Sequence, residues 1–170
     1  MNSLFPSASF ELIPCGTADL LLEEWGHYLG KMNRPFGRQD WALVVGGDPV
    51  CVATSASTVG VSAAGYNRFE VVELARLCRS PDHGWSTRVC LRLWREIAGP
   101  LWPHWDPKAV VAYSQNDRHE GRIYRFDGWT RHSDNVGGGA GGGTWTKKRA
   151  ETHKALGRKS VWKWEYPVSD

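Results

Sequence analysis

Hydrophobic and polar positions along the chain predict an alternation of strands and helices. In residues 69–80, FEVVELARLCRS, apolar and polar side chains alternate and β-forming residues are frequent, so we predict a long central strand. The strand ends at a turn, because Pro81 lacks an amide donor and Gly84 permits positive φ. A helix is predicted from residue 86 to about residue 98. Apolar residues at helical spacing along it are Val89, Cys90, Leu93, Trp94 and Ile97.

The same patterns continue on both sides of this unit. Gly46-Gly47-Asp48-Pro49 separates the two arms of a predicted hairpin, and Gly128 ends a short helical turn before an extended run from Trp129. The expected order begins with a strand (residues 10–15), a helix (18–30) and a hairpin (41–45 and 50–55). The central strand (69–80), the helix (86–98) and a buried strand (109–114) follow. A short helix around residues 123–124 and a last strand near residues 161–166 complete it. This order predicts an α/β fold in which helices flank a mixed sheet.

The segment from the central strand to Trp129 resembles the GNAT acyltransferases. In that superfamily a strand, turn and helix cradle the pyrophosphate of acetyl-CoA, and a tyrosine a few residues before a glycine-aromatic pair is a general acid. Tyr124 precedes Gly128-Trp129 in this way. The resemblance implies a mostly antiparallel central sheet and general-acid chemistry at Tyr124. The turn here, SPDHGWSTR, holds only Gly84, where the superfamily has a Gln or Arg followed by x-x-Gly-x-Gly or Ala.

Within the superfamily, two blocks of this chain are similar to the Mom family of phage DNA-modification proteins. They are ELARLCRS at residues 73–80 and HEGRIYRFDGW at residues 119–129, and the resemblance covers about a third of the chain. It implies addition of a carbamoylmethyl group to the exocyclic amine of adenine, which protects phage DNA from restriction, and it suggests iron. Mom-like proteins carry an acidic residue just after the strand that ends here at Ser114, a position we assign to Asp117.

These patterns and resemblances give a set of candidate site residues. The resemblance implies proton transfer at Tyr124, and Arg76 needs a partner or a ligand because an unpaired buried charge is costly. Ser114 and Asp117 follow a strand end where ligands collect, although both are also good helix caps. Tyr124 is equally consistent with packing against the sheet. The candidates for cofactor binding are Ser80, His83, Gly84, Trp85 and Ser86, and the candidates for metal binding are His83 and His119.

The end of the chain differs in composition. Residues 136–143, VGGGAGGG, predict a flexible loop, and residues 144–166 hold seven lysines and arginines against two glutamates. A basic segment with interleaved tryptophans predicts contact with phosphates and bases, while core tryptophans beside a solvated charged face would give the same pattern. The candidate DNA-binding residues are Lys147, Lys148, Arg149, Lys154, Arg158 and Lys159.

Length and composition limit the remaining possibilities. A chain of 170 residues with 41% hydrophobic residues predicts one domain with a real core. No apolar run approaches the roughly 20 residues of a membrane helix, so we expect a cytoplasmic protein, in the host cell if phage-encoded, with no membrane partner. Four scattered cysteines predict reduced thiols.

The leading hypothesis is therefore a Mom-like DNA base-modifying enzyme whose partners are DNA and a small-molecule donor. One alternative is an N-acetyltransferase that uses acetyl-CoA on a small-molecule or protein amine. The other is a non-catalytic DNA-binding protein on the same scaffold, which would bind DNA in a salt-sensitive way and form no product.

Overall fold

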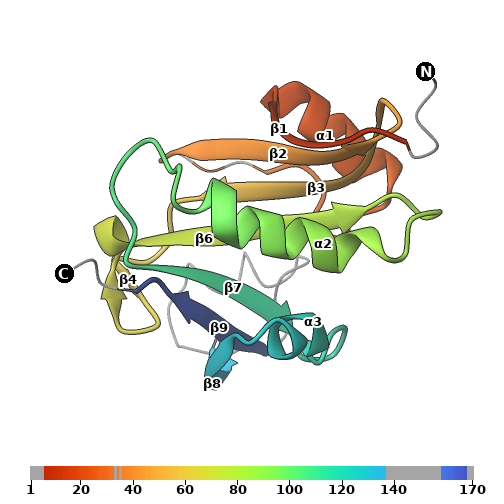
Figure 1. Ribbon diagram of the computed structural model, residues 1–170. Helices are drawn as coiled ribbons and strands as arrows, with labels where there is room; N and C mark the ends of the chain where they lie inside the picture. Colours follow the sequence, from red (N-terminus) through yellow and green to blue (C-terminus); the bar gives the residue numbers. More distant parts are fainter. Residues whose placement is uncertain (1–5, 33, 35, 137–157, 168–170) are drawn as a thin grey trace.

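A seven-stranded sheet forms the centre of the computed structural model, which describes residues 6–32, 34, 36–136 and 158–167 (Figure 1). Its spatial order is β1-β2-β3-β6-β7-β9-β8. Only β6 and β7 pair in parallel, and every other neighbouring pair is antiparallel. The strands are β1 (Ala8–Ile13), β2 (Arg38–Val45), β3 (Asp48–Ala56), β6 (Val71–Arg79), β7 (Ala109–Gln115), β8 (Thr130–Val136) and β9 (Lys159–Glu165). The prediction of a mixed, mostly antiparallel sheet is confirmed.

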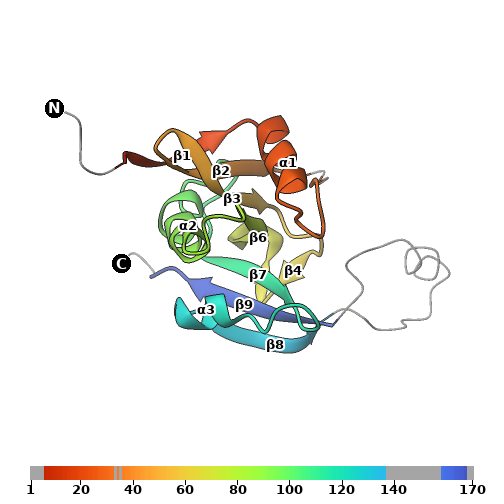
Figure 2. The same cartoon turned by 90° about the vertical axis from the view of Figure 1, so that its right-hand side faces the viewer.

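Two of the helices cover opposite faces of this sheet, as Figure 2 shows with α1 and α2 on either side of the strands. A π-helical turn extends α2, and the short α3 follows β7. A small hairpin and a 3-10 turn precede β6. The bounds are α1 (Cys15–Glu24), α2 (Ser86–Leu93), the π-helical turn (Trp94–Ala98), α3 (Arg122–Phe126), β4 (Ser62–Ala63), β5 (Tyr66–Asn67) and the 3-10 turn (Arg68–Glu70).

Several predicted boundaries were wrong: the first strand spans Ala8–Ile13 and not residues 10–15, and the first helix begins at Cys15 and not at residue 18. Two further differences have a clear local cause. The first helix ends at Glu24 and not at residue 30, because Gly26 adopts a φ of 69° and starts a loop. The central strand begins at Val71 and not at residue 69, because the Asn67 side chain accepts a hydrogen bond from the Phe69 amide and caps a 3-10 turn.

The face of the sheet under α2 holds the larger part of the core. Trp94 is completely buried and donates a hydrogen bond from Nε1 to the Ser55 hydroxyl at 2.8 Å. Leu91 and Cys90 of α2 pack with Val72 of β6 in the same cluster. The four cysteines all lie in the described part of the chain and are free thiols. Of the predicted apolar positions of this helix, Cys90 and Trp94 are buried, Leu93 is half-buried, and Val89 and Ile97 are exposed, so the spacing marks the buried side only in part.

A β-bulge in β6 changes which face its side chains reach. Leu74 lies opposite Ser55, whereas Arg76 lies opposite Thr54, so Ala75 is the extra residue. Ser55 contacts Trp94 on the α2 face, and the Thr54 hydroxyl bonds to Asp40 on the other face. Since opposite residues share a face, the bulge turns Arg76 to the α1 face, where strict alternation would have left it under α2.

The two parallel strands separate soon after they meet. Pairing joins Val71–Leu74 of β6 to Ala109–Ala112 of β7 and goes no further. Figure 1 shows the strands starting side by side and diverging toward their C-terminal ends, where α2 begins and α3 follows β7. We call the space between the diverging ends, Ala75–Arg79 of β6 and Tyr113–Gln115 of β7, the wedge.

Gly121 allows the segment before α3 to lie directly on Trp162. Its φ is 68°, and an added Cβ would overlap the indole ring. Gly26 has nearly the same φ of 69°, but nothing lies within 4 Å of the position of its Cβ. We expect Gly26→Ala to cost about 1 to 2 kcal/mol of unfolding free energy from backbone strain alone. Gly121→Ala should cost at least about 2 kcal/mol more, because strain and overpacking add.

Denaturant unfolding of the two alanine variants beside the wild type measures the difference. Equal losses of stability in Gly26→Ala and Gly121→Ala would contradict the close packing of residue 121 against Trp162.

Candidate active site

The wedge leaves backbone hydrogen-bonding groups of β6 without a strand partner on one side. Beyond Leu74 the strand is paired only with β3, since its pairing with β7 has ended. Backbone N–H and C=O groups are strong hydrogen-bonding groups that need partners when they are covered. An extended ligand that carries amide groups can therefore bind here as an additional strand does.

The turn after β6 places the N-terminus of α2 at the open end of the wedge. The His83 amide donates to the Ser80 carbonyl at 3.2 Å, and the Ser86 amide donates to the His83 carbonyl at 3.0 Å. The first amides of a helix have no partner within it and carry partial positive charge, which suits phosphate groups. Gly84 and Trp85 are exposed at this position, and Trp85 has 53% of its surface accessible.

The side chains of two predicted cofactor-binding residues, Ser86 and His83, make hydrogen-bonding contacts within the turn. The Ser86 hydroxyl is buried and lies 3.1 Å from the Val50 carbonyl and 2.7 Å from the His83 carbonyl, so it holds the turn against β3. A ring nitrogen of His83 lies 3.3 Å from the Ser80 hydroxyl. The turn thus presents backbone groups, together with the exposed Trp85.

Tyr124 projects from α3 into the aromatic core. Its ring lies 5.7 Å from the ring of Trp162, nearly parallel to it, and 5.3 Å from the ring of Trp129, edge to face. Burial raises the pKa of Tyr124, and the nearby Tyr28 raises it further. A tyrosine is protonated at neutral pH even at its ordinary pKa, so the phenol can donate a proton but cannot serve as a base.

Buried polar contacts fix the two tryptophans that hold Tyr124. Trp162 donates from Nε1 to the Ser114 hydroxyl at 2.8 Å, and Trp129 donates from Nε1 to Asp127 at 3.1 Å. Asp127 is also 3.1 Å from Nε of Arg95, an ion pair in which both side chains are 5% exposed. Ser114, a predicted catalytic residue, therefore lies under Trp162 and orients the aromatic wall of the site.

Arg76 lies on the opposite face of the sheet from Tyr124, as the bulge requires. Its guanidinium donates to the Gly30 carbonyl at 3.1 Å and to the Ala75 carbonyl at 2.7 Å. Burial and the charge of Arg34 lower its pKa. Arg76 thus fastens the loop after α1 to the edge of the wedge.

Glu73 is a second ionisable residue of β6 on this face, and the sequence did not single it out. It is 5% exposed and forms an ion pair of 2.6 Å with Arg34. Burial raises the pKa of its carboxyl, although Arg34, Arg76 and Lys159 act in the opposite direction. A carboxylate between apolar Val72 and Leu74 is the one signal in the sequence that points to a special role.

The remaining candidates are dispersed. Asp117 is exposed and accepts a hydrogen bond from Gln115 at 3.3 Å, and His119 is exposed on the same loop. In the described ranges no three His, Cys, Asp or Glu side chains are grouped so that they could hold a metal, so the suggestion of iron gains no support.

Much of the predicted DNA-binding segment cannot be compared with the structure. Arg158 is exposed and Lys159 is half-buried. The other four basic candidates, Lys147, Lys148, Arg149 and Lys154, and residues 137–143 of the glycine-rich segment lie outside the described residues.

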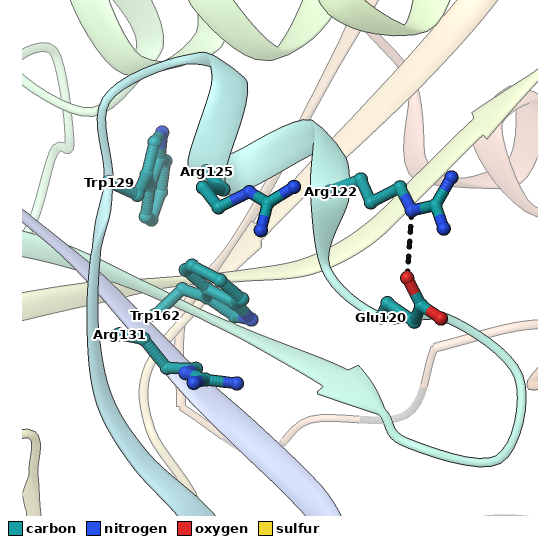
Figure 3. A pocket seen from close by; sticks show the side chains of 6 residues that line it. All are labelled: Glu120, Arg122, Arg125, Trp129, Arg131 and Trp162. Atoms are coloured by element: carbon teal, nitrogen blue, oxygen red, sulfur yellow. Dashed lines mark hydrogen bonds and ion pairs between the residues drawn. The ribbon is translucent and has the colours of Figure 1, made fainter.

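A pocket of about 370 Å³ is lined by side chains of α3, β8 and β9, among others, including Trp129 and Trp162, which pack against Tyr124 (Figure 3). Arg122 forms an ion pair with Glu120 at 2.7 Å, while the guanidinium carbon of Arg131 lies 5.9 Å from the centre of the Trp162 ring. Three arginines and one glutamate line this pocket, so its walls are basic. The lining residues are Glu120, Arg122, Arg125, Trp129, Arg131 and Trp162.

Comparison with solved structures identifies the fold. An acetyltransferase from Salmonella typhimurium with its cofactor acetyl-CoA matches with a TM-score of 0.62 at 10% identity, over 96% of this chain and 98% of that one. A probable acetyltransferase from Staphylococcus epidermidis matches with a TM-score of 0.60 at 8% identity, over 95% and 100%. An acetyltransferase of the GNAT family from Desulfovibrio desulfuricans matches with a TM-score of 0.59 at 12% identity, over 94% and 99%.

The chain therefore has the GNAT fold, as predicted. No family model matches the sequence, and no curated protein matches it. The finer resemblance to the Mom family stays a prediction. Among the described residues, no helix is long and apolar enough to cross a membrane.

Proposed function

We propose that this protein transfers an acyl group from a coenzyme A thioester to an amine. The observation that carries the proposal is the wedge: β6 has unpaired groups there, α2 begins at its open end, and α3, which holds Tyr124, follows β7 at the same end (Figure 1). The Salmonella typhimurium structure of the same fold is described with acetyl-CoA as its cofactor. The structure thus favours the alternative reading of the sequence over base modification.

The residues present fit such a donor. The amides at the start of α2 would hold its diphosphate, and Ala75–Arg79 would pair with its amide-containing arm. Bound acyl-CoA would supply an activated thioester. Asp82 is exposed on the turn, which also lacks a second glycine, so we expect weaker diphosphate binding than a glycine-rich turn would give.

Two residues on opposite faces of the sheet have the properties needed for proton transfer. Glu73, with its raised pKa, would accept a proton from the attacking amine, directly or through a water molecule. Tyr124 would donate its proton to the sulfur as the carbon-sulfur bond breaks and the carbon-nitrogen bond forms. Trp129 and Trp162 would exclude water from Tyr124 because they cover its ring.

The role of Tyr124 can be tested with Tyr124→Phe. The substitution keeps the ring that packs between the tryptophans, so stability and acetyl-CoA binding should change little. Turnover should fall about 100-fold or more, because general acid catalysis contributes about 10² to 10⁴. Tyr66→Phe is the control, since Tyr66 contacts Glu165 in another part of the molecule. Thiol release from acetyl-CoA in the presence of amines reports turnover, and full activity in Tyr124→Phe would remove Tyr124 from the mechanism.

A second candidate function is the modification of DNA bases implied by the HEGRIYRFDGW block. Arg122, Arg125 and Arg131 around the pocket beside α3 favour contact with phosphates. Trp129 and Trp162 are only 4% and 3% exposed, which leaves little ring surface for a base to stack on. The arginines thus support nucleic-acid binding more than they support base recognition.

Nucleoside mass spectrometry on DNA from cells that express the protein decides between these functions. Base modification predicts a new adduct on adenine that disappears in Tyr124→Phe. Acyl transfer to another amine predicts unmodified DNA together with consumption of acetyl-CoA by the purified protein. A non-catalytic DNA-binding protein predicts neither product, and DNA affinity that falls steeply with salt.

A further inference from the structure

Three cations and one carboxylate share the α1 face of the sheet beside the wedge. Glu73 and Arg76 come from β6, Lys159 comes from β9, and Arg34 comes from the loop between α1 and β2. We call Arg34, Arg76 and Lys159 the cation cluster.

Strand register explains why these residues meet. Lys159 lies directly opposite Gln115, the last residue of β7, and opposite residues share a face. The bulge at Ala75 brings Arg76 to the face that Glu73 already occupies. Arg34 contacts Glu73 directly at 2.6 Å, and the charges of Arg34 and Arg76 both shift the pKa values of Lys159 and Glu73.

The charges of the cation cluster are only partly balanced. Arg34 pairs with Glu73, and its second terminal nitrogen, Nη1, is buried without a hydrogen-bond partner in the described part of the chain. Arg76 donates to two backbone carbonyls and to no carboxylate of a described residue. Lys159 forms no ion pair with any residue that the structure describes. One carboxylate therefore faces three cations.

Other ionisable groups near the cluster do not supply the missing negative charge. Arg38 is already paired with Asp19 at 2.8 Å and with Asp40 at 2.7 Å, so these carboxylates are engaged. Asp117 is exposed, accepts a hydrogen bond from the Gln115 side-chain amide at 3.3 Å and forms no ion pair with a described residue. Burial and the charge of Arg76 lower the pKa of His27 to about 4, so His27 is neutral.

Like charges in a half-buried place are costly, and a bound anion removes that cost. Burial lowers the pKa of Lys159; Glu73 acts in the opposite direction, and the charges of Arg34 and Arg76 lower this pKa further. Gln115 contributes a buried carbonyl oxygen that has no hydrogen-bond partner among described residues, and it lies beside Lys159 in the register. An acceptor of this kind suits the N–H groups of an amine.

We propose that the cation cluster binds a carboxylate or phosphate group of the amine substrate, so that the acyl acceptor is an anionic amine. The inference rests on the proposed acyl transfer, and it names the class of acceptor. Arg76 lies in the part of β6 that β7 no longer pairs with, and Lys159 lies opposite Gln115 at the end of β7, so both residues border the wedge. An amine whose anionic group contacts Arg76 and Lys159 would thus direct its nitrogen toward the wedge.

Lys159→Met is the sharpest variant, because it removes a repelled charge and keeps most of the side-chain volume. In chloride buffer its melting temperature should equal or exceed that of the wild type. Inorganic phosphate or malonate, compared with chloride at equal ionic strength, should stabilise the wild type, and the apparent affinity should fall about 10-fold or more in Lys159→Met. Lys108→Met is the matched control: exposed Lys108, just before β7, pairs with Glu70 of the 3-10 turn, so this substitution should leave anion binding unchanged.

Acceptor kinetics separate phosphate from carboxylate as the recognised group. With saturating acetyl-CoA, kcat/KM should be higher for phosphoethanolamine or β-alanine than for ethanolamine, and only the values for the anionic amines should fall in Lys159→Met. An anion effect that survives in Lys159→Met, a melting temperature well below that of the wild type, or equal use of ethanolamine would overturn the inference while acyl transfer stands. Binding of phosphate or malonate needs no turnover, so it tests the cation cluster even if acetyl-CoA is not a substrate.

Discussion

The divergence of β6 from β7 is the constraint on which the rest of the site depends. Parallel pairing ends at Leu74 and Ala112, so each strand continues with one edge unpaired inside the sheet. Elsewhere in a folded protein such edges are covered or paired, because unsatisfied backbone groups are costly. Keeping the strands apart requires side chains packed on both faces. The stacked Trp162 and Tyr124 lie on one face, and the contacts of Arg76 lie on the other.

The sheet divides the proposed chemistry between its two faces. The α2 face is aromatic, and burial there raises the pKa of Tyr124. The α1 face is charged, and burial there raises the pKa of Glu73. Because the two environments differ, one residue can donate a proton while the other accepts one at the same pH. The bulge at Ala75 is the local feature that places Arg76 with Glu73.

The sequence predicts the elements well where the hydrophobic period is regular, as in β6, α2 and β7, and the aromatic pattern around Tyr124 marks the short helix. It does not predict the bulge, because alternation by itself places Arg76 under α2. Nor does it reveal that Arg34, which is 39 residues before Glu73, pairs with it, since such contacts depend on how α1 and its loop pack on the sheet. The sequence groups Lys159 with the other basic residues near the end of the chain. It does not predict that Lys159 belongs with Arg34 and Arg76.

Amide hydrogen exchange with and without acetyl-CoA tests the central claim most directly. If the wedge binds the donor, saturating acetyl-CoA should slow exchange in Ala75–Arg79 and at the first amides of α2, and it should leave β1 and β2 unchanged. Protection confined to the arginine-lined pocket beside α3, or no protection at all, would contradict the assignment of the wedge as the acyl-CoA site.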